Sequence, residues 1–306
     1  MNPTDGDDLR LGKAEGTSLV RGRKTGNTAI LPRLHDAHVT HGPNLWKRCV
    51  TGLLASCALV GMARAQTADE VAKQLSNPIA SLTSVPFQGN FDFGGGPDGD
   101  GFGFTLNVQP VVPIPLNADW TVISRTIIPL SYRDYTSVPD HDVSGVGDIT
   151  QSFFFSPTNS VNGVTWGVGP VFLLPTATDD SLGSGKFGVG LTGVVLKQTG
   201  PWTVGALANH IWSVAGEDDR PDVNATYIQP FLSYALGKGQ TLSLNAESSY
   251  NWETEQWVVP INVGYSKVFK AGDQLMSFQV GAKYYADGPS GIPDWGLRTT
   301  LTLLFP

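Results

Sequence analysis

The sequence has two cysteines, five histidines and few charges, and it contains no apolar run of the roughly 20 residues that a membrane-spanning helix needs. Both cysteines, Cys49 and Cys57, lie near the amino terminus, so the rest of the chain forms no disulfide. A mean hydropathy of -0.06 excludes a bundle of membrane helices. What remains is rich in glycine, with 36 residues, and in aromatics, at 10%, which is typical of a β protein with many turns.

A short apolar run at 50–62 follows Lys47 and Arg48 and ends at Ala63-Arg64-Ala65. A positive flank, an apolar core and a small-x-small site are the parts of a signal peptide. At about 13 residues the run is too short for a transmembrane anchor, which must cross ~30 Å of hydrocarbon. We therefore predict a leader at 47–65 with cleavage after Ala65.

We expect the mature protein to begin at Gln66. Residues 1–46 are polar and lack periodicity, so we interpret them as a disordered stretch from an incorrectly assigned start. Nine of the 20 Lys and Arg and five of the 27 Asp and Glu precede Gln66, which leaves 11 basic and 22 acidic residues, a net charge of about -11. That balance argues against nucleic acid as a partner.

Residues 66–86 carry one helical signal. Thr67 is followed three residues later by Glu70, the spacing of a capping box, and apolar residues then recur on one stripe up to Leu75. An extended linker with two prolines follows at 77–86. We expect this segment to lie in the periplasm or to enter a barrel mouth as a short plug.

From residue 87 the hydrophobic period changes to two, which indicates strands. We count about twelve, at 87–93, 102–112, 120–130, 145–155, 164–174, 186–197, 202–213, 222–236, 241–252, 257–269, 274–286 and 294–305. Most approach the ~9 to 11 residues that cross a bilayer when tilted, whereas soluble strands usually have about 5 to 6. The sequence predicts an all-β protein, a transmembrane antiparallel barrel over 87–306.

The last strand shows the pattern most clearly. In DWGLRTTLTLLFP, residues 294–306, apolar side chains alternate with Gly, Arg and Thr, and aromatics stand at both ends. A lipid-facing wall requires this alternation, because its backbone groups must pair without water. The alternative, an edge strand of a soluble sandwich, is less favoured because the pattern recurs along the whole chain.

The predicted connections alternate between short turns and longer loops, and the longer loops carry most of the acid. In an outer-membrane barrel these loops are extracellular. Their candidate carboxylates are Asp98, Asp100, Asp179, Asp180, Glu217, Asp218 and Asp219. Such oxygens are able to bind divalent cations, but none of the loops has calcium-loop spacing, so we favour a solvated acidic rim and predict no metal.

Aromatic residues cluster at the predicted strand ends, where the two girdles of a membrane barrel need them. The predicted girdle comprises Trp120, Trp202, Trp212, Trp252, Trp257, Trp295 and Phe305.

Charges inside the strands fall on the polar face, which in a barrel faces the lumen; on the lipid face an Arg or Lys would cost about 2 to 4 kcal/mol. The set is Asp92, Arg125, Asp148, Glu247, Lys283 and Arg298. These residues either line a pore or pair across it. Closure of the barrel places the first strand beside the last, so we predict that Asp92 and Arg298 pair directly at that seam.

No cofactor is expected. The GxGxxG match at 188–193 lies within a strand and opens no helix, and the glycine-rich stretch ending at Lys186 is followed by Phe187 where a P-loop needs Ser or Thr. A hydrolase needs a nucleophile within reach of a base. The histidines past the leader are His141, in a loop, and His210, for which we favour a structural role at the interface. We therefore predict that the protein is not an enzyme.

Several runs resemble one family: NPIASLTSVPFQGNFDFG at 77–94, FLLPTATDDSLGSGKFGVG at 172–190, RPDVN at 220–224 and the closing LRTTLTLLFP. They are similar to the outer-membrane transporters of the MetA-pathway of phenol degradation family, sometimes mislabelled neuromedin U and distantly FadL-like. The resemblance covers 77–306. FadL-type channels carry a longer N-terminal plug than the roughly 20 residues here.

The resemblance implies a Gram-negative outer-membrane barrel that passes small, hydrophobic or aromatic compounds passively. It also implies contacts with outer-membrane lipid and lipopolysaccharide, and insertion by the barrel-assembly machinery through the C-terminal strand. The alternative function is a non-conducting structural or adhesion barrel that works through its acidic loops. An outer-membrane hydrolase comes third.

Overall fold

The computed structural model describes residues 67–134 and 142–305. The predictions for residues 1–46, for the leader at 47–65 and for His141 lie outside the described residues.

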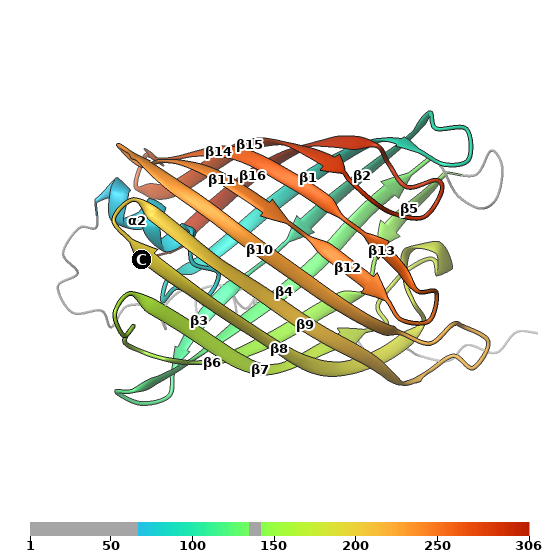
Figure 1. Ribbon diagram of the computed structural model, residues 1–306, viewed down its shortest axis with the longest axis horizontal. Helices are drawn as coiled ribbons and strands as arrows, with labels where there is room; N and C mark the ends of the chain where they lie inside the picture. The colour runs from blue at the N-terminus through green and yellow to red at the C-terminus, as the bar shows by residue number, and fades with distance from the viewer. Residues whose placement is uncertain (1–66, 135–141, 306) are drawn as a thin grey trace, which may run out of the picture. The chain divides into compact units, whose positions relative to one another are not determined.

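The described chain folds into a closed antiparallel barrel of twelve strands, four of which are broken into two segments (Figure 1). The segments are β1 (Thr83–Gly95), β2 (Gly101–Val108), β3 (Val111–Pro115), β4 (Trp120–Arg133), β5 (Val143–Val146), β6 (Ile149–Pro157), β7 (Val164–Leu174), β8 (Lys186–Thr199), β9 (Trp202–Gly216), β10 (Asn224–Gly237), β11 (Gln240–Ala246), β12 (Ser248–Asn251), β13 (Gln256–Val258), β14 (Pro260–Ala271), β15 (Gln274–Tyr285) and β16 (Trp295–Phe305). The expected fold class and strand number are confirmed.

Closure joins the first strand to the last. β1 pairs with β16 from Thr83 opposite Phe305 to Phe93 opposite Trp295, and the chain returns through β10 to β11. Since every strand then has two neighbours, the backbone polar groups of the wall are paired, as a lipid environment requires. β1 begins at Thr83 rather than at 87, so the linker ahead of it is shorter than predicted.

The breaks within strands follow from local sequence. Gln109 and Pro110 separate β2 from β3, and Pro110 has no N–H to give to the ladder. Glu247 separates β11 from β12, and its backbone N–H donates to the carbonyl of Pro260 at 3.0 Å. Alternation continues through both breaks, so Gln109 and Glu247 still point into the barrel, where both line cavities.

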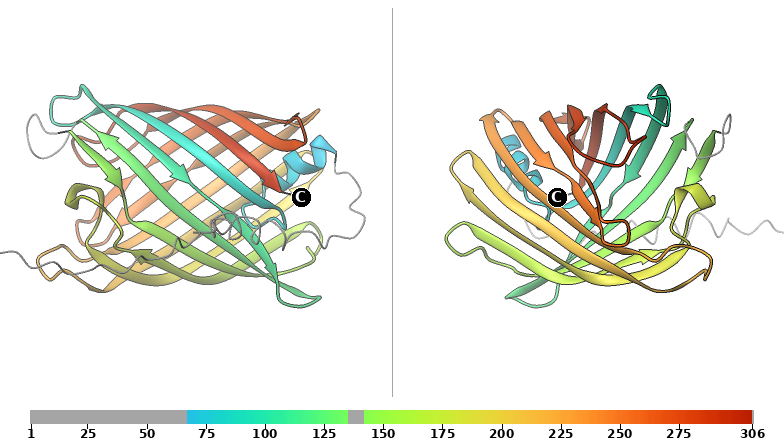
Figure 2. Two further views of the ribbon diagram at one scale, coloured as in Figure 1. Left: turned by 180° about the vertical axis from the view of Figure 1, so that it is seen from behind. Right: turned by 45° about the vertical axis from the view of Figure 1, so that its right-hand side comes forward.

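The two ends of the barrel differ. Thr83 and Phe305, where the wall begins and ends, lie at one end, called here the terminal end, together with the short turns. The longer connections meet at the opposite end, called the loop end; one of them carries a short 3-10 helix, η1 (Asp180–Leu182). Figure 2 shows the two ends from behind and obliquely.

The inner wall divides into two sectors. The apolar sector lies on β4, β6, β8 and β9, where Ile123, Phe154, Val194, Leu196 and Leu207 are buried together. The polar sector lies on the barrel strands from β11 through β16 to β2. Its buried inward side chains include Asn90, Asn262, Lys283, Arg298 and Thr302.

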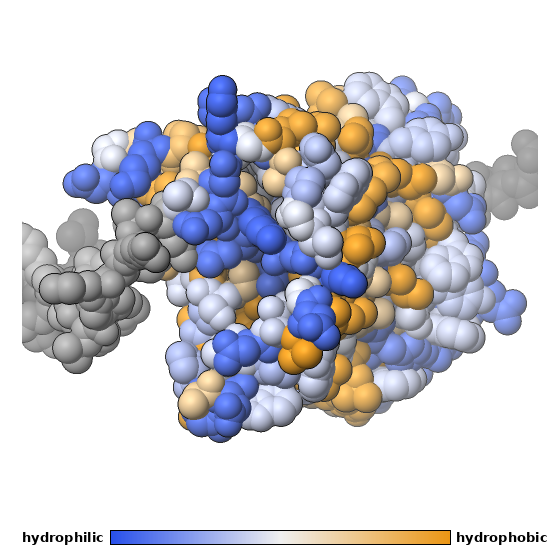
Figure 3. Space-filling model, turned by 60° about the vertical axis from the view of Figure 1, so that its left-hand side comes forward, coloured by the Kyte–Doolittle hydropathy of each residue, from blue (hydrophilic) through white to orange (hydrophobic). Residues whose placement is uncertain are grey.

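The outer wall is hydrophobic. Large apolar side chains such as Leu191, Val204, Val263, Val280 and Leu297 are exposed on the strands, as lipid-facing positions of a barrel must be. Figure 3 looks toward the terminal end and shows hydrophobic residues over the flank, with hydrophilic residues gathered nearer the viewer. Among the described residues, no helix is long and apolar enough to span a membrane.

The predicted helix is present as α2 (Ala68–Leu75), at the terminal end (Figure 1). Its capping box is formed: the Glu70 N–H donates to Thr67 Oγ1 at 3.2 Å, and the Thr67 N–H donates to Glu70 Oε2 at 2.8 Å. Val71 and Ala72 are buried against Val268 and Leu304 of the barrel wall. The amphipathic stripe read from the sequence therefore packs inside the barrel.

Candidate functional site

A buried ion pair forms the centre of the polar sector. Arg298, on β16, donates from Nη1 and Nη2 to the two carboxylate oxygens of Glu247 at 2.8 and 2.7 Å. The Arg298 side chain is 9% exposed and that of Glu247 is 22% exposed. Arg298 Nε also donates to Asn90 Oδ1 at 2.8 Å, and Gln229 donates to Glu247 at 3.4 Å. This fork-to-fork geometry joins β16 to the interruption between β11 and β12, across β14 and β15.

A second ion pair joins Lys283, on β15, to Asp92, on β1, with Nζ to Oδ1 at 2.9 Å. The two strands are not neighbours, because β16 lies between them. Gly296 of β16 stands opposite Asp92 on one side and opposite Lys283 on the other. A Cβ at Gly296 would come within 2.6 Å of Asp92 Oδ1, so the glycine leaves the space through which the lysine reaches the carboxylate.

The predicted direct pair between Asp92 and Arg298 is wrong. The register places Arg298 opposite Asn90 and Asp92 opposite Gly296, and each charge takes another partner. Pairing across the seam does occur, but it uses Lys283 from the next strand. The physical reason is reach: a Lys stem crosses the open position at Gly296, while the Arg298 guanidinium is already held by Glu247.

Arg125, on β4, extends the network toward the apolar sector. Its Nη2 donates to Gln109 Oε1 at 3.0 Å, and Gln109 Nε2 donates to Gln88 Oε1. Gln88 Nε2 in turn lies 3.5 Å from Asn90 Oδ1, which Arg298 also contacts. A continuous hydrogen-bonded chain thus crosses the lumen from β4 to β10; we call it the belt. It consists of Arg125, Gln109, Gln88, Asn90, Arg298, Glu247 and Gln229.

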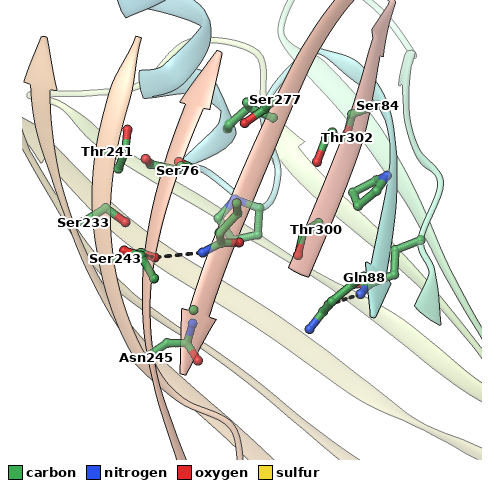
Figure 4. A pocket seen from close by; sticks show the side chains of 18 of the residues that line it. Ser76, Ser84, Gln88, Ser233, Thr241, Ser243, Asn245, Ser277, Thr300 and Thr302 are labelled. Carbon is green, nitrogen blue, oxygen red and sulfur yellow. Dashed lines mark hydrogen bonds between the residues drawn. The ribbon is translucent and has the colours of Figure 1, made fainter. Parts of the chain in front are cut away.

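Two cavities border the belt. The inner cavity, about 280 Å³, lies between the belt and the terminal end, and its lining of hydroxyl and amide side chains is seen in Figure 4. There Gln279 Nε2 donates to Ser243 Oγ at 3.0 Å. The outer cavity, about 430 Å³, includes Ile127, Leu207 and Ile211 in its wall. Arg125, Gln109, Gln88 and Glu247 line both, so the belt separates the two spaces.

Residues 67–82, called here the plug, close the inner cavity at the terminal end. Ile79, 3% exposed, inserts into the apolar sector against Ile123 and Phe154. Asp69 accepts a hydrogen bond from the Gly239 N–H, and Gln198 Nε2 donates to the Lys73 carbonyl at 2.9 Å. Segments at both ends of the plug therefore hold it to different parts of the wall.

Asp148 is placed differently from the other predicted lumen charges. It lies between β5 and β6, and its carboxylate accepts from the Ser184 N–H and Oγ at 2.6 and 2.7 Å and from the Ala177 N–H at 3.2 Å. Its position between two strands, at the loop end, makes it an anchor for the loop at 175–185. Arg220 adds hydrogen bonds to the Asp180 and Gly183 carbonyls of the same loop.

The acidic loop residues are spread along the loop end. Asp98 and Asp100 are exposed, as are Asp180 and the run from Glu217 to Asp219. Asp179 caps η1 by accepting from the Ser181 N–H at 2.9 Å. Within 67–134 and 142–305, His, Cys, Asp and Glu side chains form no group of three or more suited to a metal ion.

The seven predicted girdle aromatics are all exposed on the barrel wall. Trp120, Trp202 and Phe305 lie at the terminal end, and Trp212, Trp252, Trp257 and Trp295 lie at the loop end. The sequence analysis missed Trp166, which packs edge-on to Trp120 with ring centroids 5.9 Å apart. Its place two residues into β7 could have been read from the same strand-end rule.

His210 lies on the outward face of β9, in contact with Trp212 at a centroid distance of 4.0 Å. Its Nδ1 is 2.7 Å from Thr226 Oγ1, which also accepts from Trp252 Nε1 at 2.8 Å. The Thr226 hydroxyl was not expected, because it comes from the neighbouring strand. His210 Nε2 is buried without a hydrogen-bond partner, so the third group that would orient a catalytic histidine is missing.

The sequence analysis also missed one ion pair at the loop end. Lys186 Nζ lies 3.3 Å from Asp222 Oδ1, and the Ser213 hydroxyl donates to the same oxygen at 3.0 Å. The hydrogen bond from Ser213, and then the Lys186 charge, hold the pKa of Asp222 below its ordinary value.

Comparison with known proteins gives the class of fold. No family model and no curated protein matches the sequence. The crystal structure of an outer membrane channel from Pseudomonas putida F1 superposes with a TM-score of 0.60, at 15% identity, over 74% of this chain and 96% of that chain. The chain therefore has the fold of an outer-membrane β-barrel.

Two further structures are less similar. Outer membrane phospholipase A from Escherichia coli has a TM-score of 0.40 at 15% identity, over 79% of this chain and 99% of that chain. OmpT, an outer membrane protein of Vibrio cholerae, has a TM-score of 0.36 at 8% identity, over 73% and 96%. At these scores neither supports a functional conclusion.

Proposed function

We propose that this protein is an outer-membrane channel through which small solutes, including hydrophobic and aromatic compounds, cross passively. The observation that carries the proposal is the interior: two cavities of about 280 and 430 Å³ adjoin a belt of hydrogen-bonded polar side chains. A barrel of about eight strands is filled by its side chains, whereas this wider one retains space on the solute path. The resemblance to the MetA-pathway family, and the fold shared with an outer membrane channel, accord with it.

The proposed path runs from the loop end through the outer cavity, past the belt, and through the inner cavity to the terminal end. The belt members are joined by exchangeable hydrogen bonds, so a polar solute group is able to replace one partner as it passes. The plug blocks the last step in this structure. Conduction therefore requires the plug to leave its seat on Ile123 and Phe154 or to shift within the mouth.

A tethered plug tests the proposal directly. From Gln66 onward the sequence has no cysteine, so Lys73→Cys with Gln198→Cys supplies the thiols for a short bis-maleimide crosslinker. The two positions are joined by a 2.9 Å hydrogen bond. We expect crosslinked protein to lose planar-bilayer conductance and uptake of neutral aromatic solutes into proteoliposomes. Each single-cysteine variant, treated with the same reagent, is the control and should remain active.

The runner-up is a closed structural or adhesion barrel, and the same belt and plug favour it. Two ion pairs and the docked plug would then serve to hold the wall rather than to admit solutes. Wild-type protein that is folded and heat-modifiable, yet shows neither conductance nor uptake, would establish this second function in place of the channel.

The location is also part of the proposal. We infer that the barrel resides in the outer membrane after cleavage behind Ala65, with the acidic loops outside. Amino-terminal sequencing of protein from the outer-membrane fraction should begin at Gln66. A product that retains residues 47–65 would show that the apolar run is an anchor.

A further inference from the structure

Arg125 differs from Lys283 and Arg298, the other two cations predicted for the lumen. Lys283 is paired with Asp92, and Arg298 is paired with both oxygens of Glu247. Arg125 forms no ion pair with any carboxylate of the described residues, and its hydrogen bond goes to the neutral amide of Gln109. A guanidinium has five N–H donors, so this single bond leaves most of its donor capacity for a ligand.

The surroundings of Arg125 are amphipathic. On the inner face of β4 it stands between Ile123 and Ile127, and its side chain forms part of the wall of the outer cavity. The same cavity is bordered by Phe154, Leu207 and Ile211. The rest of the lining carries neutral hydroxyl and amide side chains, among them Thr150 and Asn209. A concave wall with apolar side chains and a few polar groups is the usual form of a small-molecule site, in which the polar groups fix the orientation of an apolar body.

We propose that the outer cavity is a binding site for organic monoanions, with a carboxylate on Arg125 and an apolar body on Phe154, Leu207 and Ile211. The planar guanidinium matches a carboxylate in a two-bond arrangement, and the apolar body gains contacts that a bare anion lacks. This inference rests on the proposed channel function and names the class of solute that the channel takes.

The lining of the outer cavity also disfavours the binding of organic cations. Glu247 borders the outer cavity, but both its oxygens are held by Arg298 at 2.8 and 2.7 Å. A cationic ligand would have to displace that guanidinium from a buried site. Arg125 requires no such exchange, since a ligand carboxylate meets a cation that forms no ion pair with the described residues.

The loop end favours a single negative charge over several. Exposed carboxylates such as Asp98, Asp100 and Asp180 lie there and repel multivalent anions, an effect that salt screens over about 8 Å at physiological ionic strength. The other donors that line the outer cavity are neutral hydroxyl and amide groups, such as those of Thr150, Thr192 and Asn209, and they stabilise a second negative charge less well than a guanidinium does. Inorganic phosphate should therefore bind much more weakly than a carboxylate with an apolar body.

Three isosteric probes test the proposal on wild-type protein folded in detergent. Isothermal titration should show that 2-naphthoate binds at least about tenfold more tightly than neutral 2-naphthamide, a difference of about 1.4 kcal/mol, with cationic 2-naphthylmethylammonium weaker still. Because this comparison needs no variant, a failure to fold cannot obscure it. Equal binding of the three probes would overturn the proposal.

Variants then locate the site. Arg125→Gln should abolish the preference for naphthoate, and Arg125→Lys, which keeps the charge but not the planar fork, should retain part of it. Lys270→Gln is the matched control: it removes one positive charge from an exposed position at the terminal end, outside the lining of both cavities, and should leave binding unchanged. A preference that survives Arg125→Gln in folded protein would assign the anion to another residue.

Binding and flux together distinguish a failure of the proposed binding site from a failure of the proposed channel function. Naphthoate binding in detergent without flux into proteoliposomes would retain the site and refute the channel. Flux of neutral aromatic solutes, together with equal binding of the three probes, would retain the channel and refute the site.

Discussion

The inner wall is apolar over β4, β6, β8 and β9 and polar, with buried charges, over the strands from β11 through β16 to β2. In the apolar sector, Ile123, Phe154 and Leu207 are buried by contact alone, and they accept Ile79 of the plug as one more apolar neighbour. In the polar sector, Lys283 and Arg298 are equally buried, but each needs a specific carboxylate. Contact between apolar groups is non-directional, whereas a buried charge depends on a named partner.

This difference indicates which positions of the inner wall tolerate substitution. Apolar side chains of similar volume replace one another at modest cost, usually below about 1.5 kcal/mol. Removal of one member of a buried ion pair leaves the other uncompensated and costs more. Stability measurements on variants of the two sectors test this difference, beginning with the largest expected effect.

The most damaging single change should be Glu247→Leu in the polar sector. It leaves the Arg298 guanidinium, 9% exposed, without the two oxygens that hold it, and we expect a loss of about 3 to 5 kcal/mol in the free energy of unfolding. Guanidinium unfolding in detergent, followed by tryptophan fluorescence, measures it. Leu207→Met in the apolar sector is the control and should cost less than about 1.5 kcal/mol.

A double variant shows whether the loss comes from the unpaired charge. Glu247→Gln with Arg298→Gln removes both charges together and should recover much of the stability lost in the single variant. If the double variant is as unstable as Glu247→Leu, the damage arises from packing and the ion pair is not its cause.

The plug should respond to truncation in the apolar sector. Ile79→Ala removes buried methyl groups from the contact with Ile123 and Phe154 and should weaken plug docking by about 2 to 5 kcal/mol. Limited proteolysis should then cleave within 67–82 while the barrel stays heat-modifiable. Val71→Ala, on the opposite seat of the plug against Val268, removes less volume and should expose the plug less.

Two glycine-to-alanine substitutions, one in each part of the inner wall, compare the sectors through smaller losses of stability. A Cβ at Gly296 would meet Asp92 Oδ1 at 2.6 Å and the Phe91 carbonyl oxygen at 2.7 Å, whereas a Cβ at Gly167 would lie 3.2 Å from Ile79 Cδ1. Gly296→Ala should therefore disturb the ion pair with Lys283 and cost about 1 to 3 kcal/mol. Gly167→Ala should cost less, because its nearest contacts, Ile79 Cδ1 and Phe154 Cβ, are both 3.2 Å away and need only a small shift.

Chemical denaturation of both variants measures the difference, and Gly193→Ala, whose Cβ would have its nearest neighbour at 3.6 Å, controls for the added methyl group. Combining Gly167→Ala with Ile79→Val should relieve the contact with the isoleucine tip and leave the one with Phe154 Cβ. Equal losses at Gly296 and Gly167 would contradict the idea that the polar sector is the less adaptable one.

The strands of the barrel wall could be predicted from the sequence, because the alternation of apolar and polar residues is a local property. Of the predicted lumen charges, Asp92, Arg125, Glu247 and Arg298 line cavities and Lys283 pairs with Asp92, since a strand turns successive side chains to opposite sides. The pairing was not predictable in this way. Lys283 reaches Asp92 because Gly296 leaves a gap in the strand between them, and the gap is visible only when three strands are placed in register.

The candidate site could not be predicted from the pattern of any single strand, for the same reason. Gln109 and Gln88 read as ordinary polar-face residues, and their role in the belt depends on their distance from Arg125 and Asn90 across β1, β2 and β4. Asp148 was predicted as a lumen charge, whereas its hydrogen bonds to Ser184 depend on how the loop folds back. Loop conformation is set by contacts that no periodicity encodes.

The smallest effect should come from the ion pair outside both sectors, where Lys186 meets Asp222 at the loop end. The Asp222 side chain is 70% exposed, so water and salt screen its interaction. Its pKa is held below the ordinary value by the hydrogen bond from Ser213 and then by Lys186, so the folded loop binds its proton less readily than the unfolded chain does. The added stability is therefore present above the ordinary carboxyl pKa.

That stability is lost as the pH falls through the lowered value in the folded protein. Protonation removes the charge opposite Lys186, whose side chain is 9% exposed, and the loop at 217–223 should open first. Hydrogen exchange of the Val223 N–H, which donates to Ser213 Oγ at 3.1 Å, follows the opening as the pH is lowered. In Asp222→Asn the acid-induced increase should disappear, while the barrel strands keep wild-type protection; an unchanged profile in Asp222→Asn would assign the transition to another carboxylate.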